Sequence, residues 1–220
     1  MTSPGLREKK KARTRRTIRE QALRLFAARG FGPTTVDQIA EAAEVSPSTF
    51  FRYFATKEQI VLDNDVDPVM VDAVRHLPDG VAPVEGLRDA VLTALGDFDG
   101  TREEMLLCIR LAFSEPDLRA RRMDHAFDTQ EALAAALAER LGRDALDLEL
   151  HAFAAAAVGA WGSALQAWAR DNGARPLAEY VDRAMAFLGG GLRLCGPVRR
   201  SPGSAGTRSA ARRPRSRRAV

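Results

Sequence analysis

Polar side chains that can contact DNA are concentrated in the stretch VSPSTFFRYFATKEQI, residues 45–60. Arg52 can donate two hydrogen bonds to guanine O6 and N7, a contact that distinguishes one base from another. Thr49 and Tyr53 can donate to phosphates, which fixes the register of a protein on the duplex without reading its sequence. Lys57 can hold a phosphate too. The same stretch is rich in aromatic residues, so it also has the composition of a hydrophobic core.

Three helices are predicted to position this stretch. Apolar residues at helical spacing predict a first helix over residues 7–29. A second helix begins near Thr35 with a capping-box pattern. Ser46 is a typical N-cap and Pro47 suits the first position of a third helix. With a short turn at residues 44–45, the second and third helices form a helix-turn-helix candidate.

A helical wheel separates the two roles of the third helix. At 100° per residue, Phe50 and Phe54 point to one side, where they can anchor the helix on its neighbours. Ser48 and Arg52 point to the opposite side and form a polar edge. Phe51 stays without an assigned role. Helical hairpins also occur in proteins that never touch DNA, so packing of the flanking aromatic residues against the body is the open alternative.

Charge is segregated along the chain, although the net charge of its 220 residues is only +4. Residues 1–60 hold 12 Lys and Arg against 6 acids, and residues 61–195 hold 13 against 23. Residues 196–220 hold 8 arginines and no acid. This pattern indicates a polyanion as partner of the head, with functionless solvated charge as the alternative. The run over residues 9–16 adds a basic arm that could follow the DNA backbone.

Other classes of protein find little support. Cys108 and Cys195 form neither a CxxC pair nor part of a His-rich cluster, which argues against a disulfide framework or a metal site. The histidines are scattered, and the known catalytic and phosphate-binding motifs are missing, so we expect no enzyme and no catalytic residues. Residues 152–169 approach the length of a membrane span, but their alanine-rich composition favours a buried helix. No signal peptide is apparent.

Residues 7–60 resemble the DNA-binding domain of the TetR family of bacterial repressors. The matching stretches are IREQALRLFAARGFGPTTVDQIAEAAEVS and STFFRYFATKEQI. The segments FFRYF and DLRARR further resemble the subgroup that includes mycofactocin-type regulators, some of which respond to acyl-CoA esters. The resemblance implies a homodimeric, all-helical repressor of nine or ten helices, whose body responds to a small molecule.

The resemblance also implies which residues contact DNA. Glu44 stands where glycine is usual, so the turn either places a non-glycine residue in the left-handed region or has a different geometry. Phe51 stands where tyrosine is common, which removes one possible phosphate hydroxyl. Together with the wheel and the helix N-termini, the predicted contacts are Thr34, Thr35, Ser46, Pro47, Ser48, Thr49, Arg52, Tyr53 and Lys57.

The rest of the chain is also predicted to be helical. Pro, Gly and Asp/Asn breaks separate helices over residues 57–76, 84–99, 101–114, 117–141, 144–171 and 177–194. We therefore expect an all-α fold with three parts. An N-terminal arm and helix-turn-helix domain span residues 1–56, a helical effector-binding and dimerisation domain spans residues 57–195, and a basic disordered tail spans residues 196–220.

Two surfaces of the body have expected roles. By resemblance, the last two helices form a four-helix interface with a second subunit, and packing inside one protomer is the alternative. The residues expected there are Phe153, Ala157, Trp161, Leu165, Trp168 and Phe187. An effector pocket is expected among the helices of residues 57–141, where methionines suit an adaptable apolar cavity. Its candidate lining residues are Met70, Phe98, Met105, Leu106, Ile109, Phe113, Met123 and Phe127.

Arg119, Arg121 and Arg122 form a cluster that could hold the phosphates of an acyl-CoA ester at the mouth of such a pocket. A solvated helix face is the alternative for this cluster.

The sequence as a whole predicts a cytoplasmic transcriptional regulator that binds operator DNA as a homodimer, takes a small-molecule effector, and requires neither cofactor nor membrane. The main rival is a non-specific nucleic-acid binder acting through its basic head and tail.

Overall fold

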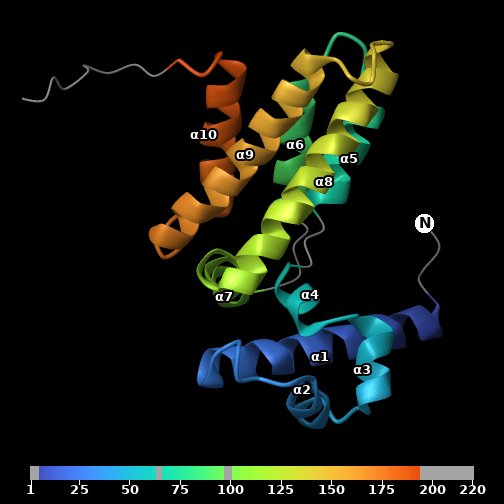
Figure 1. Ribbon diagram of the computed structural model, residues 1–220, viewed down its shortest axis with the longest axis vertical. Helices are drawn as coiled ribbons and strands as arrows, with labels where there is room; N and C mark the ends of the chain where they lie inside the picture. Colours follow the sequence, from blue (N-terminus) through green and yellow to red (C-terminus); the bar gives the residue numbers. More distant parts are fainter. Residues whose placement is uncertain (1–4, 63–65, 97–100, 194–220) are drawn as a thin grey trace, which may run out of the picture.

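The computed structural model describes residues 5–62, 66–96 and 101–193, and its regular secondary structure in these ranges is entirely α-helical (Figure 1). The long axis of the molecule runs from a small unit that contains α1 to α4 into a larger body that contains α5 to α10. The helices are α1 (Leu6–Arg29), α2 (Val36–Ala42), α3 (Pro47–Tyr53), α4 (Lys57–Leu62), α5 (Val66–Arg75), α6 (Pro83–Gly96), α7 (Arg102–Ser114), α8 (Pro116–Leu141), α9 (Leu148–Arg170) and α10 (Leu177–Gly189).

The helix predicted over residues 57–76 differs in the structure, where α4 ends at Leu62 and α5 begins at Val66. Pro68 is the third residue of α5. Proline has no N–H to donate and is tolerated in the first turn of a helix but not in its interior, so a helix starts shortly before it. The expectations for Phe98 and for the tail of residues 196–220 lie outside the described residues.

The small unit is held together by one apolar core to which several of its helices contribute. Ile18, Phe26, Ile39, Phe50 and Phe54 are at most 2% exposed and belong to one cluster. Each such side chain stabilises the fold by about 1.5–3 kcal/mol on burial. The cluster therefore fixes α3 against α1 and α2.

The body is a bundle in which α9 lies between α8 and α10 (Figure 1). Its core includes Leu133, Leu137, Trp161, Trp168 and Met185, all at most 6% exposed. Among the described residues, α9 is the one helix whose length and hydropathy would allow it to cross a membrane. Here it packs through its buried face against its neighbours in the bundle, as expected for the core helix of a helical domain.

The small unit and the body share part of their packing. Cys108, Leu111 and Ala112 of α7 and Leu118 of α8 belong to the same apolar cluster as the aromatic residues of α3. Helices α1 and α4 both pack on α7. A shift of α7 or α8 would therefore act directly on α1 and α4, because they share this packing.

Candidate DNA interface and ligand cavity

The turn between α2 and α3 has the backbone geometry of a helix-turn-helix. The Thr35 hydroxyl accepts from the Gln38 N–H at 3.3 Å, and the Gln38 side chain accepts from the Thr35 N–H at 3.1 Å, completing the predicted capping box. Glu44 has a φ of 54°, the left-handed region in which glycine is favoured. Of the two geometries left open for Glu44, the structure therefore contains the left-handed turn.

Helix α3 divides its residues as the wheel predicted. Phe50 and Phe54 are fully buried, whereas Ser48 and Arg52 are exposed on the other side. The Ser46 hydroxyl accepts from the Thr49 N–H at 3.1 Å and caps the helix. The outward edge of α3 therefore presents polar groups that no core packing requires.

Arg15 of α1 fixes the far end of α3. Its Nη1 donates to the carbonyl oxygen of Tyr53 at 3.1 Å, and its guanidinium lies 4.6 Å from the centre of the Phe54 ring. Arg52 stacks at 5.3 Å over the ring of Tyr53, a half-buried residue. Phe51 is 55% exposed and touches Phe50 edge-on, so it lies on the surface of the small unit.

Two residues of the predicted DNA-binding set have structural partners instead. Thr34 is fully buried, and its hydroxyl donates to the Gly30 carbonyl at 2.7 Å. The Lys57 ammonium donates to the carbonyls of Phe31, Gly32 and Thr34 at 2.8, 3.1 and 2.8 Å. All three of its N–H groups are thereby used, so Lys57 ties the α1–α2 loop to α4 rather than offering hydrogen bonds to phosphate.

The basic run at the N-terminus is helical and forms the first turns of α1 (Figure 1). Lys9, Lys10, Lys11 and Arg13 are exposed there. Figure 1 shows this part of α1 extending beyond α3, so its exposed basic residues add positive charge at the end of the small unit where α3 lies. Such charge attracts the DNA backbone without reading its sequence.

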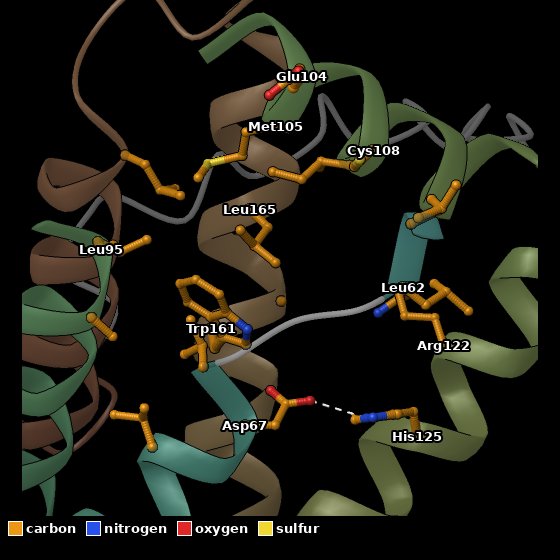
Figure 2. A pocket seen from close by; sticks show the side chains of 18 of the residues that line it. Leu62, Asp67, Leu95, Glu104, Met105, Cys108, Arg122, His125, Trp161 and Leu165 are labelled. Atoms are coloured by element: carbon orange, nitrogen blue, oxygen red, sulfur yellow. Dashed lines mark ion pairs between the residues drawn. The ribbon is translucent and has the colours of Figure 1, made fainter. Parts of the chain in front are cut away.

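A cavity of about 630 Å³ lies where the small unit meets the body. Its wall is mainly apolar and includes Met105, Ile109, Phe113, Trp161 and Leu165. Figure 2 shows Met105, Trp161 and Leu165 among the side chains that line it. Helix α1 also contributes to the wall through several side chains, among them Arg19. A molecule bound here would therefore contact both units at once.

Arg122 is the most unusual polar group in the cavity wall (Figure 2). Its guanidinium lies 4.2 Å from the centre of the Phe113 ring. Among the described residues, its Nε is the one buried side-chain nitrogen or oxygen without a hydrogen-bond partner. Burial first, and the nearby positive charge of Arg119 second, lower the pKa of Arg122. A buried donor of this kind favours a ligand that brings an acceptor group.

Three further polar contacts connect helices around the cavity. Arg19 donates to the Ile60 carbonyl at 3.2 Å and to Cys108 Sγ at 3.7 Å, which links α1 to α4 and α7. Burial raises the pKa of the Cys108 thiol to about 11, against the opposing effect of Arg19. The third link is an ion pair in which His125 Nδ1 lies 3.0 Å from Asp67 Oδ2.

The structure places only part of the predicted pocket set in the cavity wall. Met105, Ile109 and Phe113 line it, while Leu106 and Met70 pack in the core. Met123 and Phe127 are 63% and 61% exposed and do not line it. They lie on the outer side of α8, because α8 presents Arg122 and Ala126 to the cavity one position before each of them.

The residues expected at the dimer interface are also divided. Ala157, Trp161 and Trp168 are buried within the protomer, and Trp161 and Leu165 line the cavity. Phe187 is 40% exposed on α10. Most of the apolar residues of α9 that were expected at the dimer interface therefore face the inside of the protomer. The packing of α9 inside the protomer explains these positions, since a helix between two neighbours buries most of its large side chains. Phe153 is half-buried against the core.

Sequence reasoning missed Arg19 and Asp67 as components of the cavity. Arg19 is one arginine of a basic helix, and nothing in its spacing marks the side that meets the body. Asp67 and His125 are 58 positions apart, so their pairing is a consequence of how α5 packs on α8.

Comparisons with known proteins agree with this architecture. A family model described as bacterial regulatory proteins, tetR family, matches residues 18–63, and one described as the MftR C-terminal domain matches residues 81–193. The regulator MftR of Mycobacterium tuberculosis, named for mycofactocin biosynthesis, is 30% identical over 188 residues, which are 84% of this chain and 93% of MftR. TcmR, an HTH-type transcriptional regulator of Streptomyces glaucescens, is 38% identical over 149 residues, which are 64% of this chain and 66% of TcmR.

Solved structures show the same fold. The complex of SmeT with triclosan has a TM-score of 0.56 at 17% identity and covers 87% of this chain and 99% of SmeT. The fatty acid degradation regulator FadR of Bacillus halodurans has a TM-score of 0.53 at 20% identity, covering 81% and 99%. The helix-turn-helix, the helical body and the match of both family models together show that this chain belongs to the TetR family of bacterial transcriptional regulators.

Proposed function

We propose that the chain is a homodimeric repressor that occupies a near-palindromic operator and is released by a small molecule bound in the cavity between its two units. The observation that carries this proposal is the cavity itself, because α1 of the DNA-binding unit and α5 to α9 of the body line the same apolar space. A ligand that fills it better when the units move apart weakens DNA binding by the same coupling free energy.

The effector class follows from the wall. Aromatic and aliphatic side chains provide the surface for an apolar body, and Arg122 provides a buried donor for a carboxylate, phosphate, phenolate or carbonyl group. Acyl-CoA esters are one member of this class. The arginine cluster of α8 is divided for such a ligand, because Arg122 lines the cavity while Arg119 and Arg121 are exposed on the outside of the helix.

The dimer is proposed to form through the outer face of α9 together with α10. Ala152, Ala155, Gly159 and Ser163 form an exposed stripe of small residues along α9, which permits close approach of a second helix. On α10, Phe187 adds an exposed aromatic ring. Two such subunits would place two α3 helices about one turn of DNA apart.

The apolar side chains of Met123 and Phe127 extend this face onto α8. They are neighbours at i and i+4, and the next residue of that row, Glu131, pairs with His151 of α9 at 3.2 Å. The row therefore lies on the α9 side of α8. We assign these two residues to the proposed dimer surface instead of the effector pocket.

The test combines selection of DNA and ligand release. Full-length protein is used to select duplexes from a random library, and the enriched site is footprinted. A palindrome protected by a species of twice 24.0 kDa, and freed by a member of the effector class such as a medium-chain acyl-CoA ester or fatty acid, is expected. Equal affinity for all duplexes, lost when residues 197–220 are deleted, would instead establish the non-specific binder. Such a regulator would act in the cytoplasm, where its operator is.

A further inference from the structure

The exposed face of α3 is half polar and half apolar. Its exposed residues are Pro47, Ser48, Phe51 and Arg52. Residues four apart on a helix are neighbours on its surface. Ser48 and Arg52 therefore form a polar row, and Pro47 and Phe51 form an apolar row beside it. The face that is expected to meet the bases thus includes a side chain, that of Phe51, which can neither donate nor accept a hydrogen bond.

Phe51 is an exposed ring in a unit that otherwise keeps its large apolar side chains buried or half-buried. It is 55% exposed, and it is the one large apolar residue on the surface among those residues of the small unit whose side chains are described. A single exposed apolar residue is ordinary on most protein surfaces. The position of Phe51 is not ordinary, because it lies next to Arg52, the residue expected to read a base.

The ring of Phe51 has a fixed support. Its centre lies 5.4 Å from the centre of the Phe50 ring, with an interplanar angle of 88°. Phe50 is fully buried in the core that joins α3 to α1 and α2. Such edge-to-face contacts are a favoured arrangement of two aromatic rings. The outer part of the Phe51 ring is therefore presented to solvent from a defined position on α3.

One group in the major groove of DNA matches such a ring. Thymine exposes its C5-methyl group there, and phenylalanine is among the side chains that contact this methyl group. The polar atoms of the base edges and the phosphates need hydrogen-bonding partners, which Phe51 does not provide. The exposed basic residues at the start of α1 attract the duplex to the same end of the small unit (Figure 1).

We propose that Phe51 contacts the C5-methyl group of a thymine in the operator, and that the protein thereby selects a thymine within about two base pairs of the base that Arg52 reads. The spacing follows because Phe51 and Arg52 are neighbours on one helix face, while successive base pairs are about 3.4 Å apart. This inference rests on the proposed function, since it concerns the same operator. It adds a specificity-determining residue that acts by apolar contact instead of hydrogen bonding.

The test replaces single thymines of the selected operator by uracil. Uracil keeps the hydrogen-bonding edge of thymine and lacks only the methyl group. The affinity of the full-length protein is measured for each singly substituted duplex. At one position in each half-site, uracil should lower the affinity about fourfold, which is the effect of losing one buried apolar carbon.

The variants then assign this loss to its side chain. In Phe51→Ala, the affinities for thymine and uracil at this position should be equal, whatever the overall loss of binding. Phe51→Leu keeps an apolar side chain and should retain a preference for thymine. Because Phe51 is more than half exposed, both variants should stay folded, which circular dichroism checks.

A matched control is Leu146→Ala. Leu146 is another exposed apolar residue, at 85%, and it lies in the connection between α8 and α9 at the other end of the molecule (Figure 1). This variant should keep the wild-type ratio of the affinities for thymine and uracil.

The outcomes separate the role of Phe51 from the proposed function. If uracil lowers the affinity of the wild type at no position, the role of Phe51 is overturned without any variant. If it lowers the affinity equally in the wild type and in Phe51→Ala, another residue contacts the methyl group, and the role of Phe51 is overturned as well. In both cases a selected palindrome leaves the proposed function standing. If the selection yields no preferred duplex, the proposed function fails and the role of Phe51 fails with it.

Discussion

Arg19, a residue of the first helix, donates a hydrogen bond to the carbonyl oxygen of Ile60 in α4 at 3.2 Å. The same guanidinium reaches Cys108 Sγ in α7 at 3.7 Å and lines the cavity. The side chain of Arg19 thus comes from the DNA-binding unit, contacts α4, the helix that leads into the body, and lines the ligand cavity.

We therefore expect Arg19→Gln to reduce the coupling between ligand and DNA. The factor by which a bound ligand weakens operator affinity is typically about 5–150 in allosteric proteins, and it should fall toward one in this variant. Ligand affinity and operator affinity are each measured alone and in the presence of the other partner. Arg24→Gln, an exposed change on the same helix, is the control. Wild-type coupling in Arg19→Gln would remove Arg19 from the mechanism.

Lys57→Met should destabilise the protein without removing a phosphate contact. Loss of the charged hydrogen bonds to the α1–α2 loop should lower the free energy of unfolding by about 2 kcal/mol. The slope of log affinity against log salt concentration should stay the same. In Lys10→Met, an exposed change at the start of α1, the slope should instead decrease by about one. A reduced slope in Lys57→Met would restore its role as a phosphate contact.

Arg52→Ala should abolish discrimination between the selected operator and a single-base variant of it. The exposed guanidinium on the polar edge of α3 is expected to supply about 1–3 kcal/mol of that discrimination. Non-specific affinity should change much less. Competition binding with the two duplexes measures the difference, and Arg75→Ala on α5 serves as a control for lost charge. Unchanged discrimination would show that other residues read the bases.

Glu44→Gly should stabilise the protein by about 0.5–1 kcal/mol, since a left-handed residue with a side chain is strained and glycine is not. The gain is a net value, because glycine also makes the unfolded chain more flexible. Chemical denaturation measures it. Glu41→Gly, inside α2, should have the opposite effect. If both changes destabilise equally, the left-handed turn carries no strain.

The Cys108 thiol should make stability fall at high pH. Its pKa is raised from 9.0 to about 11 by burial, so the native state keeps its proton where the unfolded state has lost it. The native state then binds more protons, and stability falls as pH rises from 9 to 11, by about 2–3 kcal/mol. Cys108→Ala should lack this loss, which parallel denaturation curves would reveal. Identical pH dependence in both proteins would contradict the shift.

Much of the DNA-binding unit could be predicted from the sequence, because its signals are local. The capping box at Thr35, the N-cap at Ser46 and the helical spacing of Phe50 and Phe54 each act within one or two turns of chain. Thr34 was assigned to DNA by the resemblance, and Lys57 by the resemblance and its place at a helix start; neither signal shows that both side chains already have hydrogen-bond partners. Their partners lie in a loop whose fold depends on packing.

The body shows where such reasoning stops. Periodicity identifies an apolar stripe on α9 but cannot say whether α8, α10 or a second subunit covers it, and Trp161 proved to face the cavity. The sequence by itself determined the all-helical class, most of the helices and the polar edge of α3, since these follow from local backbone and side-chain preferences, but it did not separate α4 from α5. Only the tertiary structure decided that Arg19, Arg122 and the Asp67–His125 pair surround one space, because their contacts join helices far apart in the chain.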